Sequence, residues 1–518
     1  MLFNSYVFLF AFLPLTLAGF FLLGRLRASL AAAWLTAASL FFYGWWNPAY
    51  VGLLALSICA NYAFGMTIAR AGAHGEPQTQ RRWLLTAVAA NLLLLAYYKY
   101  ANFFVAGINE IAGTGWSPGD IVLPLGISFF TFTQIAFLAD TCQGRVREYN
   151  FVHYGLFVTY FPHLIAGPVL HHAEMMPQFA RRETYRLNYE NLAVGSTIFV
   201  IGLFKKVMLA DGIGVYAKPV FDAAATGMEL TALEAWGGAL AYTFQLYFDF
   251  SGYSDMAIGL SRLFGVTLPL NFHSPYKAVN IIDFWRRWHM TLSRFLRDYL
   301  YFPLGGNRRG VVRRHVNLML TMALGGLWHG AGWTFVLWGV LHGVYLVINH
   351  GFRALRARLG HDLAHPTRWG RACGCAVTFV AVVVGWVLFR APDAASALAM
   401  LKAMAGCNGL VLPDFWLPQW GAAGQWLAAL GVRFGDTHDL VGGGLVNWIS
   451  ILLLVVWFAP NTQQLLAVYR PALVLPDDTP PARWAWRPSP VFALLVAGLA
   501  LIAIFNLHRQ SEFLYFQF

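Results

Sequence analysis

The sequence predicts an all-α polytopic membrane protein, and three observations carry this prediction. Apolar residues make up 58% of the 518 residues and charged residues only 12%, roughly half the usual charged share of a soluble protein. Mean hydropathy is +0.54, and the chain holds 42 Phe, 22 Tyr and 20 Trp. The apolar residues run in continuous stretches, whereas the strands of an outer-membrane barrel alternate apolar and polar residues. This pattern excludes a soluble multidomain enzyme, a disordered chain and a fibrous repeat.

The apolar stretches define the expected spans in chain order. The first stretch, Met1–Arg25, carries its basic residues after the apolar run, which indicates a spanning helix rather than a signal peptide. Several others are shorter than the ~20 residues of a straight span, which indicates tilted or re-entrant pieces. We expect one transmembrane domain over residues 1–518 with about eleven spans. The further stretches lie near Ala28–Trp46, Tyr50–Ala69, Trp83–Phe104, Ile121–Ala139, Phe151–Leu170, Leu192–Ala210, Leu233–Phe248, Val316–Trp328, Trp333–Ile348, Ala376–Phe389, Leu445–Phe458 and Val491–Leu507.

The charge distribution predicts the orientation in the membrane. The net charge is +12, and an excess of this kind is typical of cytoplasmic loops. We expect no nucleic-acid binding, since no soluble domain is present to hold a basic cleft. With basic clusters such as Arg308–Arg314 placed inside, the tail of residues 508–518 is extracytoplasmic. The cluster Arg181/Arg182/Arg186 does not fit this alternation, which indicates a re-entrant segment around Phe161–Leu170.

Cysteine spacing points to neither a disulfide framework nor a metal site. The five cysteines form no CxxC pair and no zinc-binding spacing. We therefore expect no metal and no permanently bound cofactor.

The densest group of polar residues is Phe284–Leu300, FWRRWHMTLSRFLRDYL. At helical spacing Trp285 and His289 share an apolar face, while Arg286 and Arg287 point elsewhere. An amphipathic helix at the membrane interface would account for the arginines. It would not account for His289, because an unpartnered buried imidazole costs free energy. The alternative is a site that contains His289, with the arginines docking a phosphate-bearing donor.

A second group is Gly325–Gly343, GGLWHGAGWTFVLWGVLHG. His329 lies there between apolar segments, and the flanking glycines allow helices to pack closely around a narrow passage. An ionisable residue at such depth predicts a functional site, and a neutral imidazole is suited to take a proton from a hydroxyl. His342 has a weaker claim, since a histidine on an apolar helix is more often a core residue.

A third group is Gln245–Gly259, QLYFDFSGYSDMAIG, in which Asp249 and Asp255 lie inside or beside a span. Buried carboxylates need partners, and Arg262 or the pair Arg286/Arg287 are the expected ones. The carboxylates either orient a catalytic histidine or form structural pairs. His163 in FPHLIAGP is expected to be a cap or turn partner.

The runs YFDFSGYSDMAIG, WRRWHMTLSRFLRDYLYFPLGGN and GGLWHG together resemble the membrane-bound O-acyltransferase (MBOAT) family. Within it they are similar to the bacterial branch that contains the alginate O-acetyltransferase membrane subunit and the teichoic-acid D-alanine transfer protein. The resemblance implies a ring of tilted helices with re-entrant pieces around a central funnel, built on core motifs in residues 121–350. It also implies a multi-pass protein of the bacterial inner membrane.

The resemblance implies roles for particular residues. His329 matches the active-site histidine of the family and His289 the second histidine of this branch. Acetyl-CoA would be the donor substrate, and an extracytoplasmic SGNH-hydrolase-like partner would place the acetyl group on a polysaccharide. The remaining expected site residues support the histidines (Asp249, Asp255, Trp285 and Trp328) or bind the donor (Arg286, Arg287, Arg308 and Arg309).

The C-terminal residues SEFLYFQF also resemble a family-related pattern, with Phe513, Tyr515 and Phe518 in the FxYxxF motif of a small companion protein in D-alanylation systems. There the tyrosine is proposed as an acyl carrier, which would make Tyr515 an acyl relay. The alternative is an aromatic belt at the membrane interface.

The expected function is a membrane O-acetyltransferase that moves acetyl groups outward for O-acetylation of an alginate- or cellulose-like exopolysaccharide. Two alternatives remain open. One is a transporter of a polysaccharide or lipid-linked sugar, and the other is a lipid or protein acyltransferase that uses long acyl chains.

Overall fold

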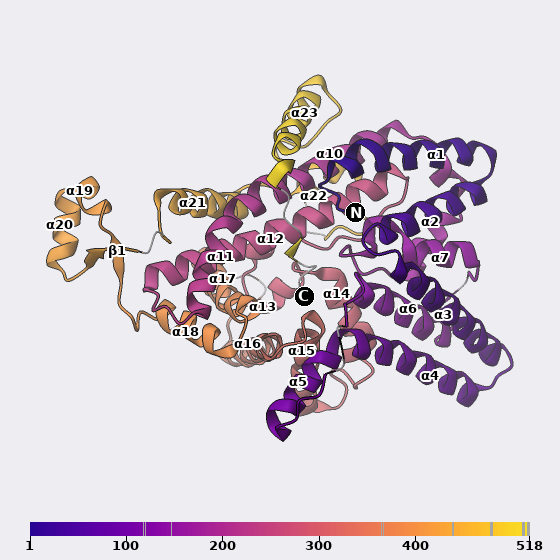
Figure 1. Ribbon diagram of the computed structural model, residues 1–518, viewed down its shortest axis with the longest axis horizontal. Helices are drawn as coiled ribbons and strands as arrows, with labels where there is room; N and C mark the ends of the chain where they lie inside the picture. Colours follow the sequence, from indigo (N-terminus) through magenta and orange to yellow (C-terminus); the bar gives the residue numbers. More distant parts are fainter. Residues whose placement is uncertain are drawn as a thin grey trace.

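The fold is almost entirely helical, as predicted. The computed structural model describes residues 1–117, 119, 121–146, 148–363, 365, 367–437, 440–476, 480–509 and 513–514. Within these ranges the strands are limited to β1 (Val411–Pro413) and β2 (Arg433–Gly435), a parallel pair in which Val411 lies opposite Arg433. The pair closes a small excursion with α19 (Trp416–Trp420) and α20 (Ala422–Ala429), which projects from one end of the molecule (Figure 1).

The N-terminal elements form one side of the molecule, apart from α5, which projects at the bottom of the view (Figure 1). Helix α1 begins with a proline in its first turn, where a missing backbone N–H costs nothing. These elements are η1 (Phe8–Phe12), α1 (Leu13–Leu26), α2 (Ala28–Gly44), α3 (Ala49–Ala73), α4 (Pro77–Leu95), η2 (Ala96–Tyr100), α5 (Ala101–Ala112) and α6 (Ile127–Cys142).

A set of short elements follows, at the place where a re-entrant segment is predicted. Helix α7 (Phe151–Thr159) and helix α8 (Phe161–Leu164) are too short to cross a bilayer, and the chain from Phe161 to Leu170 is buried. His163 is a turn partner, as expected, because its Nε2 lies 2.9 Å from the Phe157 carbonyl oxygen. Helix α9 (His172–Phe179) and η3 (Arg182–Tyr185) complete the set.

Helix α12 (Ala232–Leu263) is the centre of the fold. A capping box formed by Thr231 and Glu234 starts it. It packs along α10 (Tyr189–Phe204), where a Cβ added at Gly202 would meet the Gly252 carbonyl oxygen at 2.6 Å. Only glycine fits at such a crossing, which is the usual way for helices to pack closely in a membrane. Elements η4 (Lys205–Ala210) and α11 (Asp211–Ala225) continue α10.

Most of the elements after α12 form the other side of the molecule, whereas α23 lies beside α10 at the top of the view (Figure 1). The elements after α12 are η5 (Pro275–Lys277), α13 (Ile281–Trp285), α14 (Met290–Leu296), η6 (Arg297–Tyr301), α15 (Gly310–His329), α16 (Trp333–Arg358), α17 (Arg368–Arg390), α18 (Ala394–Met404), α21 (Gly443–Phe458), α22 (Thr462–Leu465), η7 (Ala467–Tyr469), α23 (Pro490–Phe505) and η8 (Leu507–Arg509).

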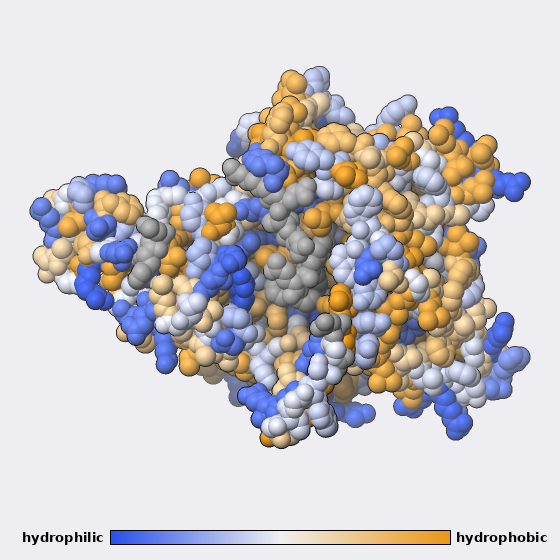
Figure 2. Space-filling model, viewed as in Figure 1, coloured by the Kyte–Doolittle hydropathy of each residue, from blue (hydrophilic) through white to orange (hydrophobic). Residues whose placement is uncertain are grey.

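The apolar helices confirm a multi-pass membrane protein. Large apolar side chains are exposed on the outer faces of α1 and α23, for example Leu15 and Leu494, and Figure 2 shows hydrophobic residues over both helices. Five shorter helices are also apolar. Six helical stretches of the described chain are long and apolar enough to span: Phe8–Leu26, Ala49–Ala73, Pro77–Ala112, Tyr189–Ala225, Trp333–Arg358 and Arg368–Arg390. The number of eleven spans stays a prediction.

Candidate active site

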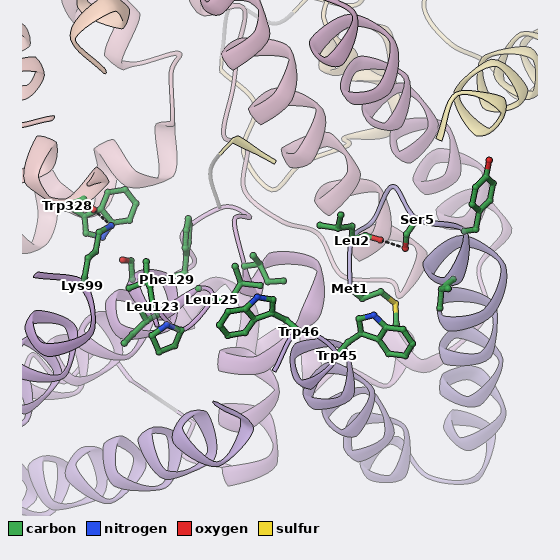
Figure 3. A pocket seen from close by; sticks show the side chains of 17 residues that line it. Met1, Leu2, Ser5, Trp45, Trp46, Lys99, Leu123, Leu125, Phe129 and Trp328 are labelled. Atoms are coloured by element: carbon green, nitrogen blue, oxygen red, sulfur yellow. Dashed lines mark hydrogen bonds between the residues drawn. The ribbon is translucent and has the colours of Figure 1, made fainter. Parts of the chain in front are cut away.

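Two cavities are lined by residues at the end of α15. The first has a volume of about 590 Å³ and is lined by the N-terminal residues, Trp45, Trp46, Lys99, residues 123–129 and Trp328 (Figure 3). The second has a volume of about 630 Å³, and its lining includes His329. We call them the Trp328 cavity and the His329 cavity. These two residues are consecutive, so the last turn of α15 lines both cavities, and we call this turn the partition.

His329 lies in an aromatic cage at the C-terminal end of α15. Its side chain is 6% exposed. The imidazole packs edge-on against Trp338 and Phe389, with ring centroids 5.2 and 5.3 Å away. The ring of His289 lies 6.4 Å from that of His329. The structure thus brings together the two histidines that the sequence predicts, although 40 positions separate them in the chain.

His289 occupies a break between two helices and not the face of a continuous helix. Helix α13 ends at Trp285, α14 begins at Met290, and His289 has a φ of +43°. The expectation of one amphipathic helix over Phe284–Leu300 is therefore wrong at this point. A non-glycine residue in the left-handed region is strained, and such strain is held where surrounding contacts over-determine it.

Asn271 supplies those contacts. Its backbone carbonyl accepts a hydrogen bond from the Met290 N–H at 3.0 Å. Its side-chain Oδ1 lies 3.0 Å from His289 Nδ1 and accepts from the Thr291 hydroxyl at 2.9 Å. With the amide in this orientation, Nδ1 of His289 carries the hydrogen, so the basic lone pair belongs to Nε2. Asn271 is not among the site residues predicted from the sequence.

The His329 cavity has arginines along its wall, but they are only partly the expected ones. Of the four predicted donor-binding arginines, all within the described residues, Arg286 lines the cavity and Arg287, Arg308 and Arg309 do not. Arg287 instead pairs with Asp283 at 2.8 Å. Three further residues of the wall are Trp285, which was expected, and Arg294 and Arg297, which were not.

Arg294 is held in place by a carboxylate on the short helix α9. Its two terminal nitrogens donate to both oxygens of Glu174 on α9, at 2.6 and 2.8 Å. A bidentate pair of this kind fixes both position and orientation. The cavity wall on α14 is thereby tied to a segment more than 100 positions earlier in the chain.

Asp249 and Asp255 are paired with lysines and not with the arginines that were expected. The Lys206 ammonium lies 2.7 Å from Asp249 and 2.8 Å from Asp211. Lys205 lies 2.6 Å from Asp255. Arg262 instead lies 3.6 Å from Glu190. Neither lysine is among the residues predicted from the sequence, although a charge inside an apolar run is rare without a function or a partner.

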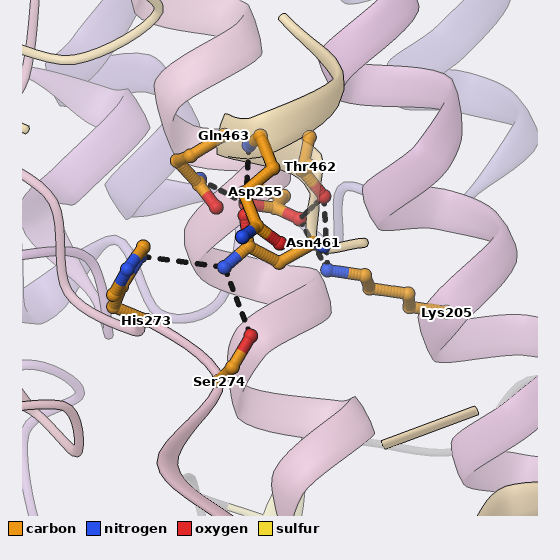
Figure 4. Close-up of polar contacts among 8 residues, drawn as sticks. Lys205, Asp255, His273, Ser274, Asn461, Thr462 and Gln463 are labelled. Atoms are coloured by element: carbon orange, nitrogen blue, oxygen red, sulfur yellow. Dashed lines mark hydrogen bonds and ion pairs between the residues drawn. The ribbon is translucent and has the colours of Figure 1, made fainter. Parts of the chain in front are cut away.

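Asp255 organises a polar network away from both cavities (Figure 4). It accepts hydrogen bonds from the Thr462 hydroxyl at 2.6 Å and from the Gln463 amide at 3.1 Å. Asn461 then donates to Ser274 at 2.9 Å, next to His273. Asp255 lines neither the Trp328 nor the His329 cavity, so this arrangement favours the structural alternative for it.

The C-terminal tail reaches Asp249. The Leu514 N–H donates to Asp249 Oδ2 at 3.0 Å, and the Phe513 side chain is 1% exposed. The Phe513 ring packs edge-on against Tyr253 with centroids 4.6 Å apart, and the Lys206 ammonium lies 4.9 Å from the ring centroid. Tyr515 and Phe518 lie outside the described residues.

Comparison with known proteins agrees with this architecture. Residues 42–388 match the model of the MBOAT, membrane-bound O-acyltransferase family. The chain is 44% identical to the peptidoglycan O-acetyltransferase of Helicobacter pylori, over 80% of this chain and 81% of that protein. It is also 44% identical to the probable alginate O-acetylase AlgI of Azotobacter vinelandii, over 80% of each chain. The teichoic acid D-alanyltransferase of Streptococcus thermophilus is 28% identical, over 51% of this chain and 68% of that protein.

Proposed function

Because the chain belongs to the membrane-bound O-acyltransferase family, we propose that this O-acyltransferase takes acetyl groups from cytoplasmic acetyl-CoA and passes them across the inner membrane for O-acetylation of a polysaccharide. An alginate- or cellulose-like exopolysaccharide is the proposed final acceptor, reached through an extracytoplasmic SGNH-like partner. Two relatives support this choice of transferred group and acceptor class, because one is named a peptidoglycan O-acetyltransferase and the other a probable alginate O-acetylase.

The observation that carries the proposal is the meeting of two cavities at Trp328 and His329. The donor enters the His329 cavity, where Arg286, Arg294 and Arg297 face its phosphates. The acceptor hydroxyl approaches from the Trp328 cavity. A group can then cross the membrane by changing carriers at the partition, without passage of coenzyme A itself.

The proposed chemistry is acyl transfer with general-base assistance. His329 takes the proton of the acceptor hydroxyl as its oxygen attacks the thioester carbonyl carbon. A new ester C–O bond forms, the C–S bond breaks, and the coenzyme A sulfur leaves as the thiol with the proton returned by His329. His289, held by Asn271, orients His329 or shuttles that proton.

A proteoliposome assay with labelled acetyl-CoA tests the proposal, run with and without the extracytoplasmic partner. His329→Gln and His329→Ala should reduce acetyl transfer by about 10²–10⁴-fold, the usual share of general acid–base catalysis. His315→Ala is the matched control, since His315 lies on the same helix but does not line the His329 cavity. Undiminished transfer in the His329 variants would exclude this mechanism. Movement of a sugar without acyl transfer would favour the transporter, and preference for long acyl-CoA would favour the lipid or protein acyltransferase.

A second proposal concerns the tail: Tyr515 accepts the acetyl group before the partner does. Support comes from Phe513 and Leu514, which are held inside the protein by Tyr253 and Asp249. An aromatic belt at the membrane interface would instead leave the Phe513 ring exposed. Tyr515 is the next residue in the sequence. A phenyl ester is a reactive donor, so the relay is chemically feasible.

Tyr515→Phe tests the relay because it removes the acceptor oxygen and keeps the ring. We expect it to stop transfer and to abolish the labelled acetyl-tyrosine that mass spectrometry should detect at residue 515 when the partner is absent. Full transfer by Tyr515→Phe would instead mean that the partner's own hydroxyl takes the acetyl group directly.

A further inference from the structure

The C-terminal carbonyls of α15 are capped by side chains from a different helix. A helix leaves its last four carbonyl groups without an intrahelical donor. Here the Tyr100 hydroxyl donates to the Leu327 carbonyl at 2.9 Å, and the Lys99 ammonium donates to the carbonyls of Trp328 and His329, at 2.5 and 3.2 Å. Three consecutive carbonyls of the partition therefore receive donors from two consecutive residues of η2.

The local shape of η2 brings both donors to the same place. Residues Ala96–Tyr100 form a π-helical turn between α4 and α5. Such turns are wider than an α-helical turn and are frequent at functional sites. No proline lies near the junction of α4 and α5. The placement of Lys99 and Tyr100 therefore comes from the π-helical turn itself.

The position of Lys99 suits a charged cap. A cation next to a helix C-terminus interacts favourably with the negative end of the helix dipole. The ammonium also lies 5.7 Å from the centroid of the Trp328 ring. Figure 3 shows Lys99 and Trp328 together on the wall of the Trp328 cavity, with the hydrogen bond to the Trp328 carbonyl drawn.

We propose that Lys99, assisted by Tyr100, is a positioning residue for acyl transfer: from the Trp328 cavity it fixes the backbone that carries His329 into the opposite cavity. The inference rests on the proposed role of His329 as the base. Lys99 holds Trp328 and His329 at their carbonyls, so both the partition and the imidazole depend on one ammonium group. A displacement of about 1 Å at a reacting group can cost on the order of 100-fold in rate.

The test compares the kcat and KM of acetyl transfer in proteoliposomes for Lys99→Met, Lys99→Arg and Tyr100→Phe. Lys99→Met keeps the length of the side chain without the donor, and it should lower kcat by about tenfold or more. The KM for acetyl-CoA should not change, because Lys99 does not line the His329 cavity. Lys99→Arg restores a cationic donor and should recover most of the loss, and Tyr100→Phe should have a smaller effect.

Lys277→Met is the matched control. Lys277 donates to the carbonyl of Ala459 at 2.9 Å, at the end of α21, which is the same kind of cap at a distant helix end. We expect it to keep kcat within about twofold of wild type. Melting temperatures of all variants in detergent complete the comparison.

Three results would overturn the inference: an unchanged kcat in Lys99→Met, an equal loss of kcat in Lys277→Met, or a Lys99→Arg variant that folds but is no better than Lys99→Met. A wild-type protein that transfers no acetyl group from acetyl-CoA would instead refute the proposed function. Any of the three results, obtained with a wild-type protein that does transfer acetyl groups, would refute the positioning role alone.

Discussion

Trp328 and His329 are consecutive residues of α15, yet they line different cavities, of about 590 and 630 Å³. The Trp328 ring stacks on Phe132 with centroids 5.3 Å apart and meets Phe129 edge-on at 5.9 Å. The His329 ring packs edge-on against the Trp328 ring itself, with centroids 4.9 Å apart, and against Trp338 and Phe389. One helical turn therefore carries both the seal between the cavities and the group proposed to act across it.

The first prediction concerns the seal. Trp328→Ala should connect the two cavities and let water reach the donor, so that coenzyme A is released without acetyl transfer. We expect transfer to fall by about tenfold while acetyl-CoA hydrolysis rises, as measured by thiol release alongside labelled product. Trp328→Phe keeps most of the ring and should be intermediate. Trp369→Ala is the control, because Trp369 is 83% exposed at the start of α17. Equal hydrolysis in wild type and Trp328→Ala would contradict the role of this side chain as a seal.

The second prediction concerns the support of His289. Asn271→Ala removes the Oδ1 that meets both His289 and Thr291, so the imidazole loses its orientation. The free energy of unfolding should fall by about 1–3 kcal/mol, as expected for a buried polar group left without its partner. The kcat for transfer should fall by about tenfold.

Asn91→Ala separates these two effects, because Asn91 and Asn61 form a buried amide pair between α4 and α3 that lines neither the Trp328 nor the His329 cavity. It should lose similar stability and keep its kcat. A loss of kcat in both variants would mean that Asn271 acts on stability alone.

The features that could be predicted from sequence are those that a local pattern encodes. Long apolar runs give the helical membrane fold. Glycines flank His329 and arginines flank His289, and the two histidine rings lie together beside the His329 cavity. Lys99, Lys205 and Lys206 could also have been found, because each interrupts an apolar run and each has a buried partner in the structure.

Other features could not be predicted, since they depend on contacts between distant segments. No glycine or proline marks the break at His289, and its left-handed backbone is held by Asn271 from another loop. Arg294 lies on the cavity wall and Arg308 does not, and Arg294 is held there by its pair with Glu174, more than 100 positions away in the chain. Helical spacing within one segment carries no information on either contact.

The third prediction concerns the buried charges that hold the tail. Lys206→Met leaves Asp249 and Asp211 without their shared cation, and an unpaired buried charge costs about 3–5 kcal/mol. We expect a large fall in melting temperature, measured by fluorescence-detected size exclusion after heating. Lys218→Met is the control, since its pair with Asp222 is exposed and should contribute about 0–1 kcal/mol. A melting temperature equal to that of Lys218→Met would show that the Lys206 cluster is not needed for the fold.

The fourth prediction uses two adjacent glycines of α15. A Cβ at Gly326 would lie 2.3 Å from the Phe335 carbonyl oxygen and 3.0 Å from the Gly339 Cα. These are backbone atoms, so Gly326→Ala must push α15 and α16 apart, at a cost of about 1–3 kcal/mol. A Cβ at Gly325 would meet only the end of the Leu296 side chain, at 3.2 Å.

Gly325→Ala should therefore leave the melting temperature nearly unchanged, because a small shift of Leu296 is offset by a gain in helix propensity of up to about 1 kcal/mol. Gly326→Ala should lower both the melting temperature and acetyl transfer, since α15 carries His329 and α16 carries Trp338 against its ring. Both variants replace one glycine of α15 by alanine, at adjacent positions, so they have the same composition. Equal behaviour of the two would mean that the close approach of α15 and α16 does not position the partition, and that His329 is held by its aromatic cage alone.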